Sequence, residues 1–167
     1  MIKKLVPDRI LDNVYQLTPS YLKSFGKNAV IFDIDNTLIA HDKRQPDQKL
    51  IDYLQSLKDT GIEICLVSNN QKERVEEFNR QLGLFAVPKA GKPKRRALLP
   101  CLDYLHTAPE NILFVGDQIL TDVWCAKKNK ISCFLVKPIK PYENKFFYLK
   151  RWLEKPVLKA YYKQEKR

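Results

Sequence analysis

Residues 28–37 read NAVIFDIDNT, and this stretch decides the fold. An apolar run of the length of one strand leads directly into two aspartates, an asparagine and a threonine. Such short apolar runs are typical of strands that are buried on both faces, as in parallel sheets covered by helices. The stretch therefore predicts a buried strand over residues 28–35 with a polar loop directly after it.

Four later runs share this apolar character, the second of them more weakly, and they occupy residues 62–68, 84–87, 111–116 and 132–136. Between the runs the apolar residues take up helical spacing, and two of these helical segments end at Gly61 and Gly83, as helices often do. A third helical segment, residues 97–105, contains Pro100, which should kink or split it. Strands that alternate with helices predict an α/β fold with a mostly parallel sheet and helices on both faces.

The composition fits one domain of this kind. The chain has 167 residues, of which 44% are hydrophobic, and this is enough for a real core. The charged side chains are 30 Lys plus Arg against 19 Asp plus Glu, a formal net charge of +11, which excludes an acidic disordered chain. No apolar run approaches the roughly 18 residues that a membrane-spanning helix needs.

The positive charge is concentrated in two segments. Residues 137–167 contain ten basic and three acidic residues, and residues 89–96 contain five basic residues and no acidic one. The rest of the chain is close to neutral. Basic segments of this kind contact anionic partners such as nucleic acid, lipid headgroups or phosphorylated substrates, although charge that only keeps the protein soluble is an alternative.

Cysteine usage and the start of the chain indicate the compartment. No C-x-x-C pair occurs, and each cysteine is expected to be a small buried side chain in a reducing environment. The four are Cys65, Cys101, Cys125 and Cys133. Pro7 and several polar residues interrupt any signal-peptide core in residues 1–17. We therefore expect a cytoplasmic protein, with peripheral attachment to the inner face of the membrane as an option.

Carboxylates follow two of the predicted strands. Asp33 and Asp35 are two residues apart, so both side chains can point the same way, and Asp117 follows the strand that ends at Gly116. In parallel sheets, ligands bind at the edge where the carboxyl ends of the strands meet. Neighbouring carboxylates resist double ionisation unless a cation lies between them, and Mg²⁺ is the natural partner of a few carboxylates plus a phosphate. The alternative is that the acidic motif only caps a turn and a helix.

Two further strand ends carry candidate phosphate ligands. Ser68 lies between a strand and a helix, where its hydroxyl and free backbone N–H groups can bind phosphate, or where it can serve as a simple helix cap. Lys92 lies in the loop AGKPK, in which Gly91 allows close approach of the backbone to a ligand. A solvated lysine is the alternative there.

Together these residues resemble the four ordered motifs of the haloacid dehalogenase-like (HAD) superfamily. The motifs are DIDNTL at residues 33–38, Ser68 with Asn69, Lys92, and Gly116-Asp117 with Asp122. The resemblance covers about residues 29–136, and four motifs in the right order make it strong. With Leu17-Thr18-Pro19 before the first strand and Gly-Lys-Pro in the third motif, the chain is similar to the YqeG-type branch of subfamily IIIA, which is related to mitochondrial phosphatidylglycerophosphatases.

The resemblance implies a Mg²⁺-dependent phosphomonoester hydrolase. Asp33 would attack phosphorus and form an aspartyl phosphate, which water then hydrolyses. Asp35 would protonate the leaving oxygen and later accept a proton from the water. Mg²⁺ would be held by Asp33, by the backbone carbonyl of Asp35 and by Asp117, with Asp122 supporting this metal site.

The same resemblance assigns the remaining polar residues. Ser68 and Lys92 would bind phosphoryl oxygens, and Lys92 would also offset charge in the transition state. Asn36, Thr37 and Asn69 would shape the loops around the site, with contact to phosphate as a secondary role.

The implied fold is a three-layer Rossmann-like HAD core with no sizeable cap domain. We expect the core over residues 28–140, an N-terminal extension over residues 1–27 that packs on it, and a basic aromatic helix or tail over residues 141–167. Only residues 39–48 separate the first motif from the next helix. An open site of this kind suits a large substrate, a substrate presented on a surface, or a neighbouring subunit; the oligomeric state is left open.

Two interpretations of the C-terminal segment remain open. Its apolar and basic side chains suit a helix lying in the interface of an anionic membrane. Alternatively, the helix packs its aromatic face on the domain and Pro156 ends it. The interleaved side chains are Lys145, Lys150, Arg151, Lys155 and Lys159 with Tyr142, Phe146, Phe147, Tyr148, Trp152, Tyr161 and Tyr162.

The leading hypothesis is hydrolysis of phosphatidylglycerophosphate. A phosphatase of nucleic-acid ends or phosphoproteins would use the same basic segments. A non-catalytic partner of RNA- or ribosome-related machinery is the third possibility, which the intact motifs oppose. Outside the motifs, we expect His41 and His106 to be surface imidazoles, with contact between His41 and the substrate as an alternative. We expect Trp124 and Cys125 to pack in the core.

Overall fold

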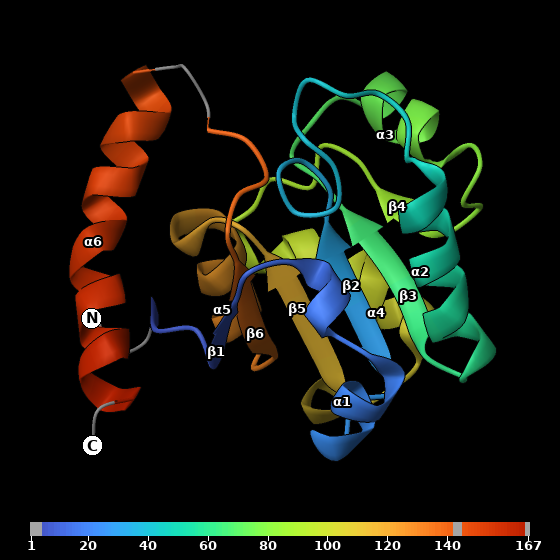
Figure 1. Cartoon of the computed structure of the whole chain (residues 1–167), viewed down its shortest axis with the longest axis horizontal. Coiled ribbons are helices and arrows are strands. Elements are labelled where there is room, and N and C mark those ends of the chain that lie inside the picture. The colour runs from blue at the N-terminus through green and yellow to red at the C-terminus, as the bar shows by residue number, and fades with distance from the viewer. Residues whose placement is uncertain (1–4, 142–144, 166–167) are drawn as a thin grey trace.

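A six-stranded parallel sheet forms the centre of the computed structural model, which describes residues 5–141 and 145–165 (Figure 1). The strands are β1 (Arg9–Leu11), β2 (Ala29–Asp33), β3 (Glu63–Val67), β4 (Phe85–Val87), β5 (Ile112–Gly116) and β6 (Ser132–Val136). Their order across the sheet is β1-β6-β5-β2-β3-β4, and every neighbouring pair is parallel. The predicted α/β fold is confirmed.

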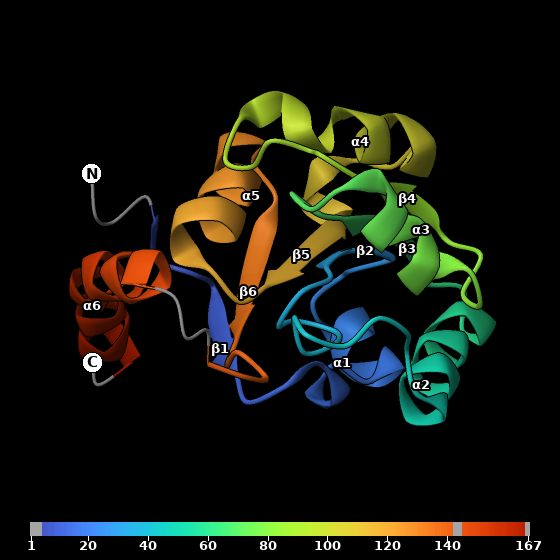
Figure 2. The same ribbon diagram turned by 90° about the horizontal axis from the view of Figure 1, so that it is seen from above.

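The helices lie on both faces of this sheet. They are α1 (Pro19–Ser24), α2 (Gln48–Asp59), α3 (Lys72–Asn79), α4 (Leu99–Leu105), α5 (Trp124–Lys128) and α6 (Lys145–Glu165). Short 3₁₀ turns occupy Val14–Gln16, Arg95–Leu98 and Pro109–Asn111, and a π-helical turn, η5, occupies Ile119–Val123. Seen from above, α4 and α5 lie on one side of the strands and α1 and α2 on the other (Figure 2). The three predicted layers are therefore present.

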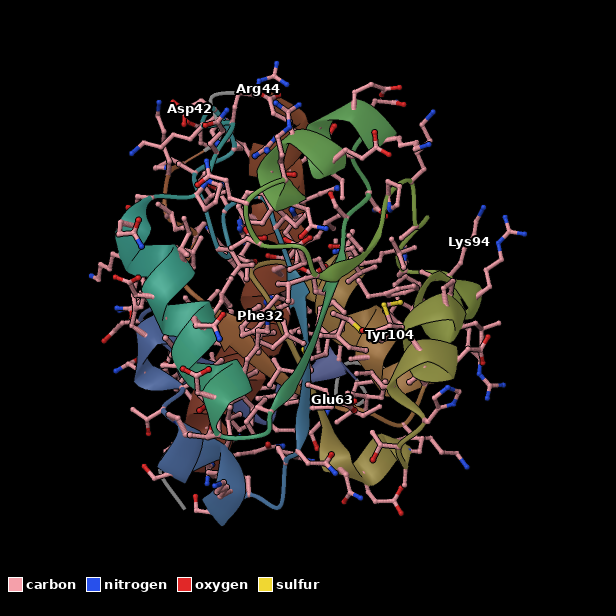
Figure 3. All side chains as sticks on the ribbon, turned by 90° about the vertical axis from the view of Figure 1, so that its right-hand side faces the viewer. Phe32, Asp42, Arg44, Glu63, Lys94 and Tyr104 are labelled. Atoms are coloured by element: carbon pink, nitrogen blue, oxygen red, sulfur yellow. The ribbon has the colours of Figure 1, made fainter. Side chains whose placement is uncertain are left out.

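Each face of the sheet has its own hydrophobic core. On one face Leu57 of α2 and Phe78 of α3 pack with Phe32 of β2, which Figure 3 shows inside the domain. On the other face Cys101 of α4 and Cys125 of α5 lie in the cluster that contains the alternate residues of β2 and β5, Ala29, Ile31, Ile112 and Phe114. All residues of β2 and β5 are buried, which explains why both strands could be predicted from apolar runs in the sequence.

The strand predicted over residues 28–35 ends two residues earlier than expected. Strand β2 ends at Asp33, whereas the sequence pattern predicted a strand as far as Asp35. The chain turns here because Asn36 has a φ of 65° and its N–H donates a hydrogen bond to the carbonyl of Ile39 at 2.7 Å. The turn keeps Asp35 outside the sheet ladder with β3.

Strand β1 was not predicted from the sequence. It has only three residues, it lies at the edge of the sheet beside β6, and none of its residues is fully buried. Pro100 acts as expected: the predicted helix is split into the 3₁₀ turn Arg95–Leu98 and α4, whose first turn contains the proline. Figure 3 shows Lys94, just before this turn, pointing away from the domain.

The two places where a cap domain would be inserted, after the first motif and after the second, hold only short segments. A loop of residues 34–47 joins β2 to α2, and α3 with its flanking turns joins β3 to β4. Within the described residues no second domain covers the carboxyl edge of the sheet, so the expected capless architecture is confirmed.

Helix α6 runs along the β1 side of the molecule (Figures 1 and 2). Val157 and Tyr161 face the domain and belong to its core, and the Tyr161 hydroxyl accepts a hydrogen bond from the Ile10 backbone. Pro156 lies inside the helix, so the expectation that it ends the helix is wrong; packing of Val157 and Tyr161 keeps the following turns in place. No helix in the described ranges is long and apolar enough to cross a membrane.

The aromatic side chains of the last segment are divided between core and surface. Tyr148, Trp152 and Tyr162 are exposed on α6. Of the other aromatic residues predicted there, Tyr142 lies outside the described residues, and for Phe146 and Phe147 only the helical backbone is described.

One expectation about core packing is wrong. Trp124 is 39% exposed, because it begins α5 at the surface and its ring packs under the Lys128 ammonium at 4.0 Å. Its neighbour Cys125 is buried as predicted, and the other three cysteines are also buried and free.

We predict that Leu57→Ala lowers the free energy of unfolding by about 2–5 kcal/mol, because the fully buried side chain would leave a cavity between α2 and the sheet. Gln55→Ala on the exposed face of the same helix should change this free energy by about 0.5 kcal/mol or less. Urea denaturation followed by circular dichroism measures both values. Equal losses in the two variants would contradict the assignment of the core face.

Candidate active site

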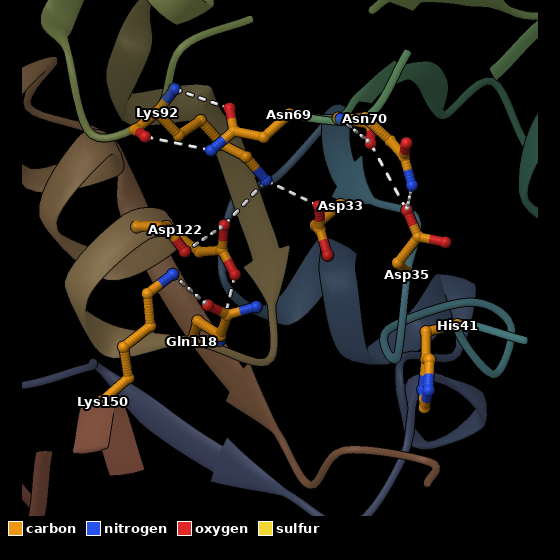
Figure 4. A pocket seen from close by; sticks show the side chains of 11 residues that line it. Asp33, Asp35, His41, Asn69, Asn70, Lys92, Gln118, Asp122 and Lys150 are labelled. Atoms are coloured by element: carbon orange, nitrogen blue, oxygen red, sulfur yellow. Dashed lines mark hydrogen bonds and ion pairs between the residues drawn. The ribbon is translucent and has the colours of Figure 1, made fainter. Parts of the chain in front are cut away.

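A pocket of about 390 Å³ opens at the carboxyl edge of the sheet, where β2, β3 and β5 end (Figure 4). Six residues selected from the sequence line it: Asp33, Asp35, Ser68, Asn69, Lys92 and Asp122. The pocket also includes His41, for which substrate contact was the alternative to a surface position, and four residues not selected from the sequence: Asn70, Gln118, Thr121 and Lys150. Asp117 and Thr37 lie beneath the pocket and are buried.

The ammonium group of Lys92 joins the two sides of this pocket (Figure 4). Its Nζ lies 2.6 Å from Oδ1 of Asp33 and 2.7 Å from Oδ1 of Asp122. All three side chains are buried. Lys92 is thus a buried cation shared by two carboxylates, and it fixes the distance between the end of β2 and the segment after β5.

Burial dominates the electrostatics of these groups. Desolvation raises the pKa of the Asp33 carboxyl to about 7, against the opposing charge of Lys92 and with help from the charge of Asp122. Desolvation alone would lower the pKa of Lys92, but the Asp122 and Asp33 carboxylates outweigh it and the net pKa is raised. Lys92 therefore stays charged across the physiological range.

Thr37 and the loop after β3 hold the reacting groups in place. The Thr37 hydroxyl donates to Oδ2 of Asp33 at 3.1 Å, so both oxygens of this carboxylate are oriented. The Asn69 amide donates to the Lys92 carbonyl at 3.0 Å and its oxygen accepts from the Lys92 N–H at 2.7 Å. Asn69 therefore shapes the Lys92 loop, and its contact with phosphate stays a prediction.

Ser68 lies between the backbone of its own loop and Asp35. Its Oγ accepts a hydrogen bond from the Asn70 N–H at 3.0 Å and donates to Oδ2 of Asp35 over 3.5 Å. The second distance is long for a hydrogen bond between oxygens. The hydroxyl proton is therefore available to a better acceptor in the pocket.

Asp35 is oriented by an arginine that the sequence analysis did not select. Arg74 of α3 donates to Oδ1 of Asp35 at 2.9 Å, and the same guanidinium donates to the carbonyls of Lys43 and Arg44. Arg74 is buried, although it lies on a largely charged helix. No motif signals this role, since Arg74 reaches Asp35 only once the loop 34–47 is folded over it.

Asp117 lies at the bottom of the site with no exposed surface. Desolvation raises the pKa of its carboxyl, and the charges of Asp122 and Asp33 add to the rise. Its Oδ1 has no hydrogen-bond partner among the described residues. Gly116 is required beside it, because a Cβ there would lie 2.5 Å from Oδ2 of Asp122.

The carboxylates of Asp33, Asp117 and Asp122 fit a hard divalent cation. One oxygen from each lies within 4.8 Å of the others. An unpartnered buried carboxylate oxygen among like charges is what such a cation would neutralise. The sequence analysis placed Asp122 in support of the metal; the structure brings its carboxylate as close as the other two.

The last helix also contributes to the site. Lys150 lines the pocket near Gln118, whose side-chain oxygen lies 3.5 Å from Nζ (Figure 4). Arg151 donates to Oδ2 of Asp117 at 2.6 Å. The sequence analysis treated both residues as part of a basic tail. His41 lines the pocket, in contrast to His106, which is exposed at the end of α4.

Comparisons with known proteins agree with this geometry. The sequence profile of the haloacid dehalogenase-like hydrolases matches residues 39–129. The Probable phosphatase YqeG of Bacillus subtilis (strain 168) is 32% identical over 161 residues, which cover 96% of this chain and 94% of that protein.

Solved structures share the fold at lower identity. An uncharacterized protein from Listeria monocytogenes serotype 4b superposes with a TM-score of 0.54 at 16% identity over 71% of this chain and 84% of that one. A putative 3-deoxy-D-manno-octulosonate 8-phosphate phosphatase from Vibrio cholerae gives 0.53 at 20% identity over 74% and 75%. The fold, the profile match and the identity to the Bacillus protein lead to one conclusion: the chain belongs to the haloacid dehalogenase-like hydrolase family.

Proposed function

We propose that the protein is a Mg²⁺-dependent phosphomonoester hydrolase that acts through an aspartyl phosphate on Asp33. The observation that carries the proposal is the Asp33 carboxylate, oriented by Lys92 and Thr37 and adjoining the carboxylates of Asp117 and Asp122. A carboxylate held in this way next to a cation site is suited to nucleophilic attack on phosphorus. The relationship to the Probable phosphatase YqeG supports the same reaction class.

In the proposed site Asp33, Asp117 and Asp122 would hold the metal, with the backbone carbonyl of Asp35 as a further ligand. Mg²⁺, when bound, would screen the negative charge of the carboxylates and of the phosphoryl group so that the two can meet.

The chain's own residues divide the first half of the reaction. An oxygen of Asp33 attacks phosphorus while the ester bond to the leaving oxygen breaks. Lys92 and the Ser68 hydroxyl donate hydrogen bonds to the equatorial phosphoryl oxygens, where negative charge accumulates. Lys92 is suited to this because it is charged and already lies 2.6 Å from Asp33.

Asp35 transfers the proton in both halves of the reaction. It gives a proton to the leaving oxygen, and it later accepts one from the water that attacks the aspartyl phosphate and releases inorganic phosphate and free Asp33. The Arg74 guanidinium and the Asn70 amide, at 2.9 Å and 3.3 Å, orient its two oxygens for these transfers.

The proposed substrate is a phosphorylated lipid at an anionic membrane surface, with phosphatidylglycerophosphate as the specific candidate. The pocket has no cap within the described chain, so a headgroup presented by a surface can enter it. Tyr148 and Trp152 are each 62% exposed on α6, the helix that also brings Lys150 to the pocket. Aromatic side chains next to cations suit insertion among anionic headgroups.

We predict that Asp33→Asn lowers kcat for phosphomonoesters by at least about 10³-fold, because the amide cannot form the phosphoenzyme. Removal of divalent cations with a chelator should abolish the wild-type rate, and Mg²⁺ should restore it. The measurement is release of inorganic phosphate from lipid, nucleotide, sugar and peptide monoesters. Asp103→Asn, which changes an exposed aspartate of α4, is the matched control and should keep the wild-type rate. An unchanged rate in Asp33→Asn would contradict the mechanism.

We predict that the loss caused by Asp35→Asn depends on the leaving group. An alkyl alkoxide needs a proton as it departs, so kcat for alkyl phosphates should fall by about 10²-fold or more. A nitrophenolate departs without one, so the loss in the first half-reaction on p-nitrophenyl phosphate should be much smaller. Burst kinetics separate this step from hydrolysis of the phosphoenzyme. Equal losses of the burst rate for both substrates would argue against an acid role for Asp35.

We predict that the protein sediments with vesicles that contain phosphatidylglycerol, that binding weakens as salt rises, and that Trp152→Ala reduces it. Trp124→Ala removes a 39% exposed tryptophan from α5 and serves as the matched control. Neutral phosphatidylcholine vesicles should bind weakly. Binding that is indifferent to lipid charge, or equally reduced in both variants, would overturn the proposed membrane surface.

A further inference from the structure

Helix α6 reaches the bottom of the active site through two side chains, Arg151 and Glu154. The Arg151 guanidinium donates from Nη2 to Oδ2 of Asp117 at 2.6 Å and from Nη1 to the Asp117 backbone carbonyl, also at 2.6 Å. Asp117 is thus held by its side chain and its backbone at once. A planar guanidinium with fixed N–H directions leaves a carboxylate gripped in this way little freedom to rotate.

Glu154 holds the arginine in position. Its side chain is only 1% exposed, and Oε2 accepts from Nη1 of Arg151 at 3.0 Å. The other oxygen, Oε1, accepts from the N–H groups of Ile119 and Leu120 at 2.7 and 3.2 Å, at the start of turn η5. Glu154 therefore fastens α6 to the segment that directly follows Asp117.

The contact between Arg151 and Asp117 leaves one carboxylate oxygen of Asp117 for another partner. Oδ2 is taken by Arg151, whereas Oδ1 is buried and accepts no hydrogen bond from the described residues. An acceptor left bare in this way is costly unless something positive meets it. Arg151 thus orients the Asp117 carboxylate through Oδ2 and leaves Oδ1 available to another ligand.

Formal charges distinguish two roles for Arg151: a competitor of the metal ion, or a residue that positions a metal ligand. If Arg151 competed with the metal ion, it would take the place of that ion, and the cluster of charged groups would be neutral with no metal bound. The cluster contains four buried carboxylates, Asp33, Asp117, Asp122 and Glu154, and two cations, the buried Lys92 and the half-buried Arg151. With all four carboxylates ionised and both cations in place, a formal charge of −2 remains, which is the charge that one divalent ion neutralises.

The geometry points to Arg151, held by Glu154, as a positioning residue of the metal site, so that α6 is an integral part of that site. The inference rests on the proposed function, which supplies the metal. Arg151 fixes the orientation of Asp117 and compensates part of the buried negative charge, and the residual charge is matched to Mg²⁺. Outer partners of metal ligands act in this way, and their loss weakens metal binding by roughly 10- to 100-fold.

The test is calorimetric titration of the metal-free full-length protein with MgCl₂ alone, without substrate. Arg151→Met should raise the Kd for Mg²⁺ by about tenfold or more. Arg151→Lys should give an intermediate Kd, because a lysine keeps the positive charge but cannot hold both Oδ2 and the backbone carbonyl oxygen of Asp117 in the same way. Glu154→Gln keeps an acceptor for the Ile119 and Leu120 N–H groups and loses the charge that holds Arg151, so its Kd should rise as well.

Two controls keep the result interpretable. Arg80→Met removes the charge of an exposed arginine after α3 and should leave the Kd unchanged. Circular dichroism and the Tm of each metal-free variant show whether it is folded. If Arg151→Met does not fold, the Arg151→Lys and Glu154→Gln titrations carry the test.

The outcomes separate this inference from the function on which it rests. An unchanged Kd in folded Arg151 and Glu154 variants, with Mg²⁺ binding to the wild type, overturns the positioning role alone. Tighter Mg²⁺ binding in Arg151→Met overturns it too and makes Arg151 a competitor of the metal. A wild type that neither binds Mg²⁺ nor hydrolyses phosphomonoesters overturns the inference together with the proposed function.

Discussion

A charged amine that is almost completely buried determines how the site is built. Lys92 is buried between the carboxylates of Asp33 and Asp122, which come from opposite sides of the pocket. Either carboxylate alone, without this cation, would be an uncompensated buried charge, which typically costs several kcal/mol. The parallel sheet makes the arrangement possible, since it brings the ends of β2, β3 and β5 to one edge and covers both faces with helices. The loop that carries Lys92, the glycine before Asp117 and the amide of Asn69 all serve this one contact.

Around that contact the site is arranged as paired opposite charges. Asp35 faces Arg74, and Asp117 faces Arg151. Both arginines come from helices that flank the motifs and not from the motifs themselves. Each acidic group that we assign to chemistry therefore has a cation that fixes its direction, and the cations come from elements far away in the sequence. Rigid placement of this kind reduces the reorganisation that a developing charge would otherwise require.

The sequence predicted what depends on local pattern. The buried strands β2 and β5 could be predicted because every residue before the last one in each is apolar. Asp33, Ser68 and Lys92 could be predicted because each lies at the end of a strand or in the loop after it, at the same edge of the sheet. Strand β1 was missed because three residues at a sheet edge carry no periodicity. Arg74, Arg151 and Glu154 were missed for another reason. Asp35, Asp117 and Ile119, which they respectively contact, lie more than thirty positions away, and only tertiary packing brings the groups together.

The position of α6 in the chain has a consequence for how the protein matures. Asp117 leaves the ribosome well before Arg151 and Glu154, which belong to the last helix. While the chain is being made, the parallel sheet can already assemble around β2 and β5, but the Asp117 carboxylate has not yet met its guanidinium. The buried acidic cluster thus receives the Arg151 side chain only after all six strands have been made, and the order of translation separates formation of the sheet from completion of the site.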